Sequence, residues 1–167
     1  MMDSESLRLL LERVRAGDSS PEEAVRQISS GGLSHDIGYA RLDLSRKARC
    51  GFPEFIFGEG KTPEQICGII GELAKGGHPV LATRVSPEAA AKALELFPEA
   101  VHDPLARTLS IRRGIARKAG GRVLVVTAGT SDLPVALEAK TTAELCGCGT
   151  ELLADAGVAG IHRLLME

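Results

Sequence analysis

The chain has 167 residues, of which 44% are hydrophobic, 25% are charged and only 3% are aromatic, and its formal net charge is −2. This length suits one ordinary domain or two small ones, and the composition excludes disordered and collagen-like chains. The near-neutral charge and the scarcity of aromatic rings argue against nucleic-acid binding. No apolar run approaches the roughly 20 residues that span a membrane, and the first residues lack a signal-peptide pattern. We therefore expect a cytoplasmic protein that binds neither membrane nor nucleic acid.

Four helices are predicted in the first hundred residues. The first is indicated by apolar residues at helical spacing from Leu7 to Val14, followed by Gly17. Three more should begin after Ser20, Thr62 and Ser86, because each is followed by Pro and Glu, as helix N-caps often are. The expected buried positions of the last two helices are Ile66, Ile69, Ile70, Leu73, Ala90, Ala93, Leu94 and Phe97.

Short strands are expected between these helices. Residues 39–44 and 107–112 alternate apolar and polar side chains, and residues 55–57 and 79–83 are short apolar runs. Residues 1–113 therefore read as a small α+β domain, followed by a linker over residues 114–121. The cations in and around this linker form either a solvated connector or a surface that faces a phosphate-bearing ligand. They are Arg107, Arg112, Arg113, Arg117, Lys118 and Arg122.

From residue 122 onward the pattern changes to a βαβ unit. Residues 123–126 form a continuous apolar run, which is typical of a strand buried on both faces of a parallel sheet. A polar turn, a helix over residues 133–146 and a second strand over residues 150–154 should follow. Ala136, Ala139 and Ala143 would give this helix a seam of small residues for close packing. The predicted fold class is α/β, with an incomplete parallel-sheet domain over residues 122–167.

Two polar turns carry the candidate site. Residues 129–132 connect a strand to a helix, where free backbone N–H groups and the helix dipole favour anions, and Ser131 or Asp132 can cap the helix. His162 and Arg163 follow the second strand. Because the carboxyl ends of neighbouring parallel strands meet at one edge, we expect all four side chains to lie close together. His162 would exchange a proton, and Arg163 would bind a phosphate or carboxylate.

The four cysteines are expected to be free thiols, as is usual in a reducing cytosol. Cys146 and Cys148 are separated only by Gly147, which is too close for a good metal chelate, and no His lies near them in the sequence. No metal site is therefore predicted.

Several separated motifs resemble the LarB family, the pyridinium-3,5-biscarboxylic acid mononucleotide synthases of nickel-pincer nucleotide cofactor biosynthesis. Residues 127–132 (TAGTSD) and 157–163 (GVAGIHR) resemble the family's site, and residues 49–54 (RCGFPE) and 57–62 (FGEGKT) resemble its N-terminal domain. The last 45 or so residues are also similar to the start of the PurE domain, the aminoimidazole ribonucleotide carboxylase. The resemblance implies a flavodoxin-like parallel sheet for this part of the chain.

The resemblance also implies a reaction. Nicotinic acid adenine dinucleotide would be carboxylated by CO₂ or bicarbonate on its pyridinium ring, and its phosphoanhydride would be hydrolysed to release AMP. In the family a cysteine thiolate is thought to add to the ring and make a ring carbon nucleophilic. The resemblance further implies a homo-oligomer, octamer-like when complete. It is compatible with Mg²⁺ at the substrate phosphates, although no residue here identifies that ion.

Site residues follow from the same resemblance. His162, Ser131 and Asp132 would be catalytic. The implied nucleotide contacts are Gly129, Thr130, Ser131, Asp132, Gly160, His162 and Arg163. Three residues of the N-terminal domain would either contact the ligand or hold the domains together, namely Arg49, Glu54 and Lys61.

The sequence departs from the family pattern in one respect. It ends at Glu167, soon after the second predicted strand, and none of its four cysteines matches the context of the family's nucleophile. We therefore expect a C-terminally truncated polypeptide that lacks carboxylase activity. The alternatives are an aminoimidazole ribonucleotide carboxylase or mutase of purine biosynthesis and a non-catalytic nucleotide-binding module.

Overall fold

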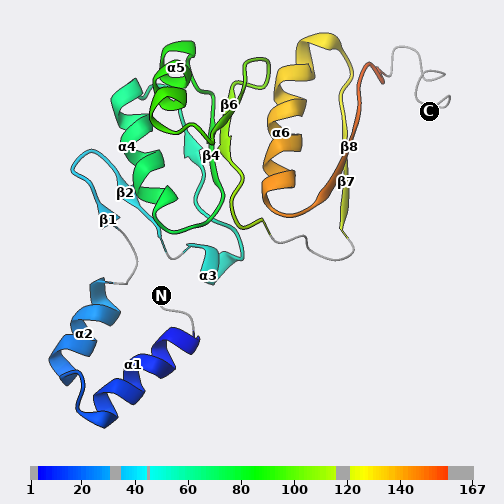
Figure 1. Ribbon diagram of the computed structural model, residues 1–167. Helices are drawn as coiled ribbons and strands as arrows, with labels where there is room; N and C mark the ends of the chain where they lie inside the picture. Colours follow the sequence, from blue (N-terminus) through cyan, green and yellow to red (C-terminus); the bar gives the residue numbers. More distant parts are fainter. Residues whose placement is uncertain (1–3, 31–34, 45, 116–120, 158–167) are drawn as a thin grey trace. The chain divides into compact units, whose positions relative to one another are not determined.

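A computed structural model of the chain describes residues 4–30, 35–44, 46–115 and 121–157 (Figure 1). The chain divides into two compact units, residues 1–54 and 55–167. The fold class is α/β, as predicted, with both mixed and parallel sheets. Within the described ranges, every helix is too short or too polar to cross a membrane. The predicted division into domains at residues 114–121 stays a prediction.

The first unit begins with a helical hairpin. Helix α1 (Ser4–Ala16) ends at Gly17, whose φ of 80° terminates the helix, and α2 (Pro21–Ser30) begins after Ser20, whose Oγ accepts a hydrogen bond from the Glu23 amide at 3.1 Å. A two-residue antiparallel pair and a short helix complete the unit. They are β1 (His35–Asp36), β2 (Arg41–Leu42) and α3 (Arg46–Cys50). The strand predicted over residues 39–44 is thus reduced to two residues.

The second unit contains a four-stranded sheet with the order β3-β4-β6-β5. Strands β3 and β4 are parallel, whereas β4–β6 and β5–β6 are antiparallel. Helices α4 and α5 pack against each other and against these strands, and the largest fully buried side chains come from this region. The elements are β3 (Ile56–Phe57), α4 (Pro63–Ala74), β4 (Val80–Thr83), α5 (Pro87–Leu96), β5 (Val101–Asp103) and β6 (Thr108–Ile111).

Both helices of this region begin where the sequence predicts. Thr62 and Gln65 form a reciprocal capping box at the start of α4, and the Ser86 Oγ accepts a hydrogen bond from the Ala89 amide at 3.2 Å. The expectation that Leu94 points inward is wrong, since 39% of it is exposed. Helix α5 instead buries the alanines at 89, 90 and 93, whose small side chains allow close approach to α4.

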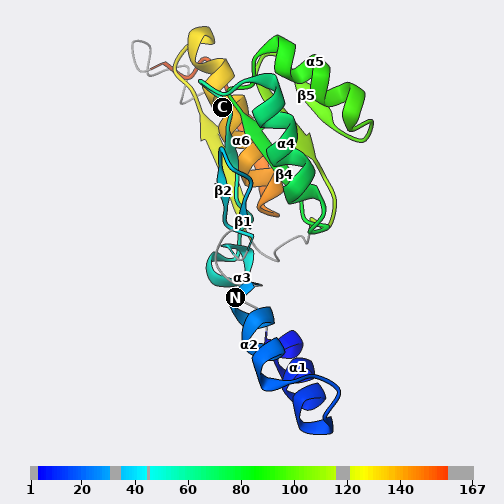
Figure 2. The same cartoon turned by 90° about the vertical axis from the view of Figure 1, so that its left-hand side faces the viewer.

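The predicted βαβ unit is confirmed. Strand β7 (Arg122–Val126) pairs in parallel with β8 (Gly149–Leu153), and α6 (Leu133–Leu145) connects them after a single 3₁₀ turn, η1 (Thr130–Asp132). Helix α6 contacts β7 and β8 and also β4. It therefore lies between the two-stranded sheet and the four-stranded sheet (Figures 1 and 2).

The prediction that residues 123–126 are buried on both sheet faces is wrong. Val123, Leu124 and Val126 are exposed, Leu124 to 57%. The physical reason is that the described part of this sheet has two strands and only α6 beside it, so most of its apolar surface has no cover. The predicted small-residue seam of α6 is also only partly correct, because Ala136 is buried but Ala139 is exposed.

Ion pairs connect α6 to the four-stranded sheet. The Arg84 Nε lies 2.6 Å from the Glu138 Oε2, and the Arg112 guanidinium lies 3.0 Å from the Glu144 carboxylate, which also accepts a hydrogen bond from the Thr150 hydroxyl at 2.9 Å. Burial raises the pKa of Glu144, but the hydrogen bonds from Thr150 and Arg112 outweigh it and keep that pKa below its ordinary value.

Two other described cations near the predicted linker also face carboxylates. Arg113 pairs with Glu99, and Arg122 pairs with Glu151. These pairs favour the interpretation of this segment as a connector over the interpretation as a phosphate-binding surface.

Replacing Glu144 by glutamine is expected to lower the free energy of unfolding by about 1 kcal/mol at pH 7, because the ion pair is partly exposed and therefore screened. The folded-state pKa lies below the unfolded value, so this contribution is present above about pH 4.5 and is lost as the pH falls through the folded pKa. Urea unfolding at several pH values measures it. The exposed Glu95→Gln variant is the control, and a Glu144→Gln deficit that is unchanged in acid would contradict the ionic origin.

Candidate functional site

The turn between β7 and α6 is closed by its own hydrogen bonds. The Asp132 carboxylate accepts a bond from the Gly129 amide at 3.2 Å, and the Asp132 amide donates to the Gly129 carbonyl at 3.1 Å. The hydroxyl of the buried Thr127 donates to the same carbonyl at 3.2 Å. Gly129 is therefore held from both sides, which fixes the path of residues 129–132.

The expected capping of α6 by the side chain of Ser131 or Asp132 is not observed. Asp132 occupies the N-cap position, but its backbone is already helical (φ −87°, ψ −12°) and its side chain makes no capping bond. The reason is that η1 leads directly into α6, so the Leu133 amide already bonds to the Thr130 carbonyl. The Asp132 carboxylate turns back to Gly129 instead.

The rim of this turn is polar and accessible. The side chains of Thr130, Ser131 and Asp132 are exposed, and Gly129 is half-buried. Within the described chain, no hydrogen bond joins the amides of Thr130 and Ser131 to another residue. Two amides at the start of a helix are thus available to an anion, as at many phosphate sites.

The turn after β8 lies directly against the turn after β7. The Thr127 amide donates to the Leu153 carbonyl and the Thr127 carbonyl accepts from the Ala156 amide, both at 2.9 Å. A Cβ atom on Gly157 would lie 2.9 Å from the Ala128 carbonyl oxygen, so only glycine fits there without a shift. The carboxyl ends of the two parallel strands therefore meet at one edge, as far as Gly157. Gly160, His162 and Arg163 fall outside the described residues, and their position near Ser131 and Asp132 stays a prediction.

Two of the three candidates from the N-terminal domain, Glu54 and Lys61, make local contacts. Arg49 belongs to α3, and the Glu54 carboxylate accepts a hydrogen bond from the Asp43 amide at 2.5 Å. The Lys61 ammonium donates to the Phe57 carbonyl at 2.6 Å. Glu54 and Lys61 therefore stabilise the backbone of their own units, and a contact of any of the three with a ligand stays a prediction.

Glycine is required in the segment that contains Lys61. The Gly58 amide donates to the Thr83 carbonyl at 2.7 Å, and a Cβ atom on Gly58 would lie only 2.8 Å from the same oxygen. Gly60 has a φ of 78°, which favours glycine. This segment thus brings the end of β3 close to the end of β4 and then starts α4.

A separate hollow of about 620 Å³ lies at the other end of the βαβ unit, where α6 ends and β8 begins. The ion pair between Arg112 and Glu144 lies in its wall, together with Cys148 and Thr150. Its charged groups thus neutralise each other. Because it lies at the amino end of β8, it is distinct from the predicted site.

The cysteines differ in exposure. Cys67 is buried, and this burial raises the pKa of its thiol, whereas Cys50 is exposed. Cys146 and Cys148 are half-buried and form no disulfide. The described residues contain no group of three or more side chains that could hold a metal ion.

Together, the βαβ unit and its paired turns define an α/β protein whose candidate site lies at the carboxyl edge of a parallel sheet. Residues 34–113 match the family described as the LarB/PurE-like N-terminal domain. Over 166 residues the chain is 35% identical to an uncharacterized protein of Methanocaldococcus jannaschii, an alignment that covers 95% of this chain and 64% of that relative. The resemblance to the LarB family is thereby confirmed, and the chain carries a domain of that type.

Sequence reasoning missed the residues that hold the two turns together. Thr127 is buried directly after a strand that is mostly exposed, and the Ala156 amide donates a hydrogen bond to its carbonyl. The signal was weak, because a threonine after an apolar run is common in turns. The pair between Arg84 and Glu138 was also missed, since 54 residues separate them and only the packed structure brings them together.

Replacing Gly157 by alanine is expected to separate the two turns and to lower the free energy of unfolding by about 1–3 kcal/mol, because the added methyl group collides with the Ala128 carbonyl. Gly149→Ala, at the other end of β8, is the control, since its Cβ would meet its neighbours at 3.7 Å or more. Urea unfolding and amide exchange at Thr127 measure the effect. Equal stability of the two variants would show that the turns are not packed as described.

Proposed function

We propose that this chain takes part, by binding the substrate, in the carboxylation of the pyridinium ring of nicotinic acid adenine dinucleotide and the hydrolysis of its phosphoanhydride, which releases AMP, in nickel-pincer nucleotide cofactor biosynthesis. The LarB/PurE-like match over residues 34–113 points to carboxylase-type enzymes. The structural observation that carries the proposal is the contact of the two turns, Thr127 with Ala156 and Ala128 with Gly157, at one sheet edge. That edge is where open α/β sheets bind nucleotides.

The turn after β7 suits the phosphates and ribose of the dinucleotide. The amides of Thr130 and Ser131 would bind a phosphate oxygen at the start of the helix, and the Ser131 hydroxyl would add a donor. The Asp132 carboxylate, which already faces the Gly129 amide, would accept a hydrogen bond from a ribose hydroxyl rather than contact phosphate.

The reaction replaces one ring proton by a carboxylate. A thiolate adds to the pyridinium ring, a ring carbon then attacks CO₂, and loss of the proton on that carbon and of the thiolate restores the aromatic ring. His162 would take this proton, and Arg163 would hold the new carboxylate. Water displaces AMP at the phosphoanhydride. None of the four cysteines here matches the nucleophile's sequence context, so we assign the thiolate to none of them.

Two alternative functions differ from the proposed one, either in the ligand that is bound or in the absence of turnover. An aminoimidazole ribonucleotide carboxylase or mutase would bind a ribonucleotide monophosphate, and a non-catalytic module would bind a nucleotide without turnover in any form of the protein. The long N-terminal region, which a purine enzyme does not need, and its Gly-Phe-Pro-Glu segment at residues 51–54 favour the first proposal over a purine enzyme. We further propose that the protein is cytoplasmic, forms homo-oligomers and binds neither nucleic acid nor membrane.

Calorimetry with this chain tests the binding site. We expect the dinucleotide to bind, and Ser131→Ala and Asp132→Asn each to weaken binding about tenfold, the effect of losing one hydrogen bond in a site of this kind. The exposed Asp18→Asn variant is the matched control. Preferential binding of aminoimidazole ribonucleotide would favour the purine alternative, and equal affinity in all variants would remove the turn from the site.

Turnover is tested separately, with bicarbonate and Mg²⁺ added and AMP followed by chromatography. We expect no AMP release from this chain, and we expect release by the Methanocaldococcus jannaschii relative, of which the chain spans 64%. A carboxylated mononucleotide should appear with the AMP in the mass spectrum. Binding without turnover in either protein would favour the non-catalytic module.

A further inference from the structure

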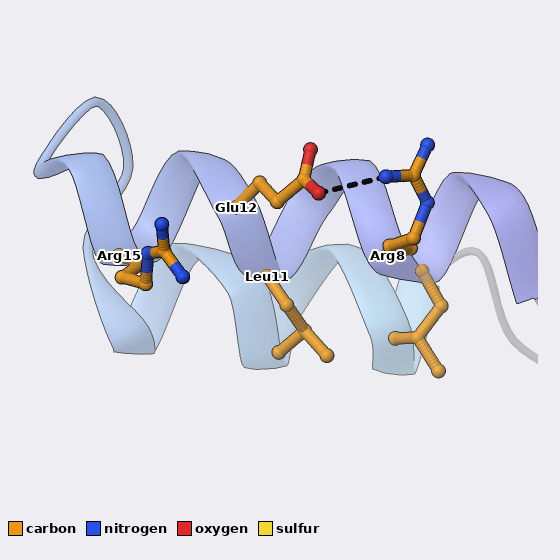
Figure 3. Close-up of a pocket in the computed structure, with 5 residues that line it drawn as sticks. Arg8, Leu11, Glu12 and Arg15 are labelled. Atoms are coloured by element: carbon orange, nitrogen blue, oxygen red, sulfur yellow. Dashed lines mark hydrogen bonds and ion pairs between the residues drawn. The ribbon is translucent and has the colours of Figure 1, made fainter.

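Large apolar side chains are exposed on α1 and on β7, and the two surfaces differ in what can cover them. On α1, the Arg8 guanidinium and the Glu12 carboxylate beside Leu11 already form an ion pair at 2.8 Å (Figure 3). These two charges neutralise each other and therefore select no particular partner. On β7, Leu124 and Val126 are 57% and 49% exposed, and a segment of the same chain begins close to them.

The two faces of the β7–β8 sheet have different surroundings. Helix α6 contacts both strands and lies on one side of them (Figure 1). The Thr150 hydroxyl donates to the Glu144 carboxylate of α6, so Thr150 faces that helix. Side chains alternate between the faces of a strand, and Leu124 is paired with Glu151, the neighbour of Thr150. Leu124 and Val126 therefore lie on the face opposite α6.

The chain leaves β8 at the carboxyl end of this face. The turn that follows β8 is tied to the turn after β7, because the Ala156 amide donates to the Thr127 carbonyl at 2.9 Å. Residues 158–167 lie outside the described residues, but their starting point is thus fixed beside the ends of both strands. Since α6 occupies one face, a helix that returned along the sheet from this turn would cover the other.

The sequence of this segment matches the spacing of the exposed side chains. Ile161, Leu164 and Leu165 have the i, i+3, i+4 spacing of the apolar face of a helix. Four helical residues rise about 6 Å. Val126 and Leu124, two residues apart in an extended strand, are separated by about 6–7 Å. A helix antiparallel to β7 can therefore place Ile161 against Val126 and Leu165 against Leu124.

We propose that residues 158–167 return along the β7–β8 sheet as a helix and cover the face opposite α6, with their apolar side chains against Val126 and Leu124. The tether at the turn after β8 and the matched spacing commit this face to that occupant. The same helix carries His162 and Arg163 to the carboxyl edge, where the candidate turn lies. The covering of the face does not rest on the proposed function, and its test needs no ligand.

Double-mutant cycles in the full chain test the contact by urea unfolding. Leu124→Ala and Leu165→Ala should each raise the unfolding equilibrium constant. Their combined effect should be at least about threefold smaller than the product of the two, because residues in contact are energetically coupled. Leu96→Ala on α5 is the matched control, since Leu96 is also 57% exposed, and its effect should multiply with that of Leu165→Ala. Strictly multiplicative effects of Leu124→Ala and Leu165→Ala would overturn the proposal.

Amide exchange measured by NMR tests the same contact without global unfolding. In the parent chain the amides of Leu164 and Leu165 should be protected, and Leu124→Asp should reduce this protection at least about tenfold, whereas Leu96→Asp should not. Unchanged protection in the four-stranded sheet is the control for folding. Unprotected amides in the parent, or equal protection in the two variants, would assign the face to a different occupant. Protection that falls on dilution would identify that occupant as a second copy of the chain.

Discussion

The candidate site depends on the backbone hydrogen bonds of Thr127. Its amide binds the end of β8 and its carbonyl binds the turn that follows, so one residue joins both strand ends. Burial strengthens these bonds, because water does not compete for a buried peptide group. Gly157 completes the contact, since any side chain there would meet the Ala128 carbonyl. The polar rim of residues 129–132 keeps its position because the backbone beneath it is paired on both sides.

Helix α6 connects the candidate turn to the rest of the second unit. It starts at the candidate turn, contacts both sheets and carries Glu138 and Glu144, which pair with arginines of the four-stranded sheet. Arg84 has a φ of 53°, which is costly for a residue with a side chain. Its ion pair with Glu138 is more than half buried and offsets part of this cost. The LarB/PurE-like segment thus orients the helix whose first turn would bind the nucleotide.

Local signals were sufficient to predict most helices. Thr62 and Ser86 start α4 and α5 because capping acts within four residues, which a sequence displays directly. The predictions that failed concern features that depend on packing or pairing with other parts of the chain. Leu94 has the spacing of a core residue, yet neighbouring alanines determine how closely α5 approaches α4. Strand β5 was missed because its pairing with β6, not its own three residues, defines it. For the site, the parallel pairing of β7 and β8 was enough to predict that the two turns meet. The hydrogen bond from the Gly129 amide to the Asp132 carboxylate was not predictable, because it depends on the residue at which α6 begins.

The exposed face of β7 explains why the apolar pattern and the structure disagree. Burying a valine or leucine side chain contributes about 1.5–3 kcal/mol to the free energy of folding. The three exposed apolar side chains of β7 therefore indicate a surface that becomes covered. The same reasoning applies to α1 and α2, where Leu9, Leu11, Val25 and Ile28 are exposed as well. The apolar pattern therefore predicts that both surfaces become covered, because exposed side chains of this size contribute to stability only when they are buried.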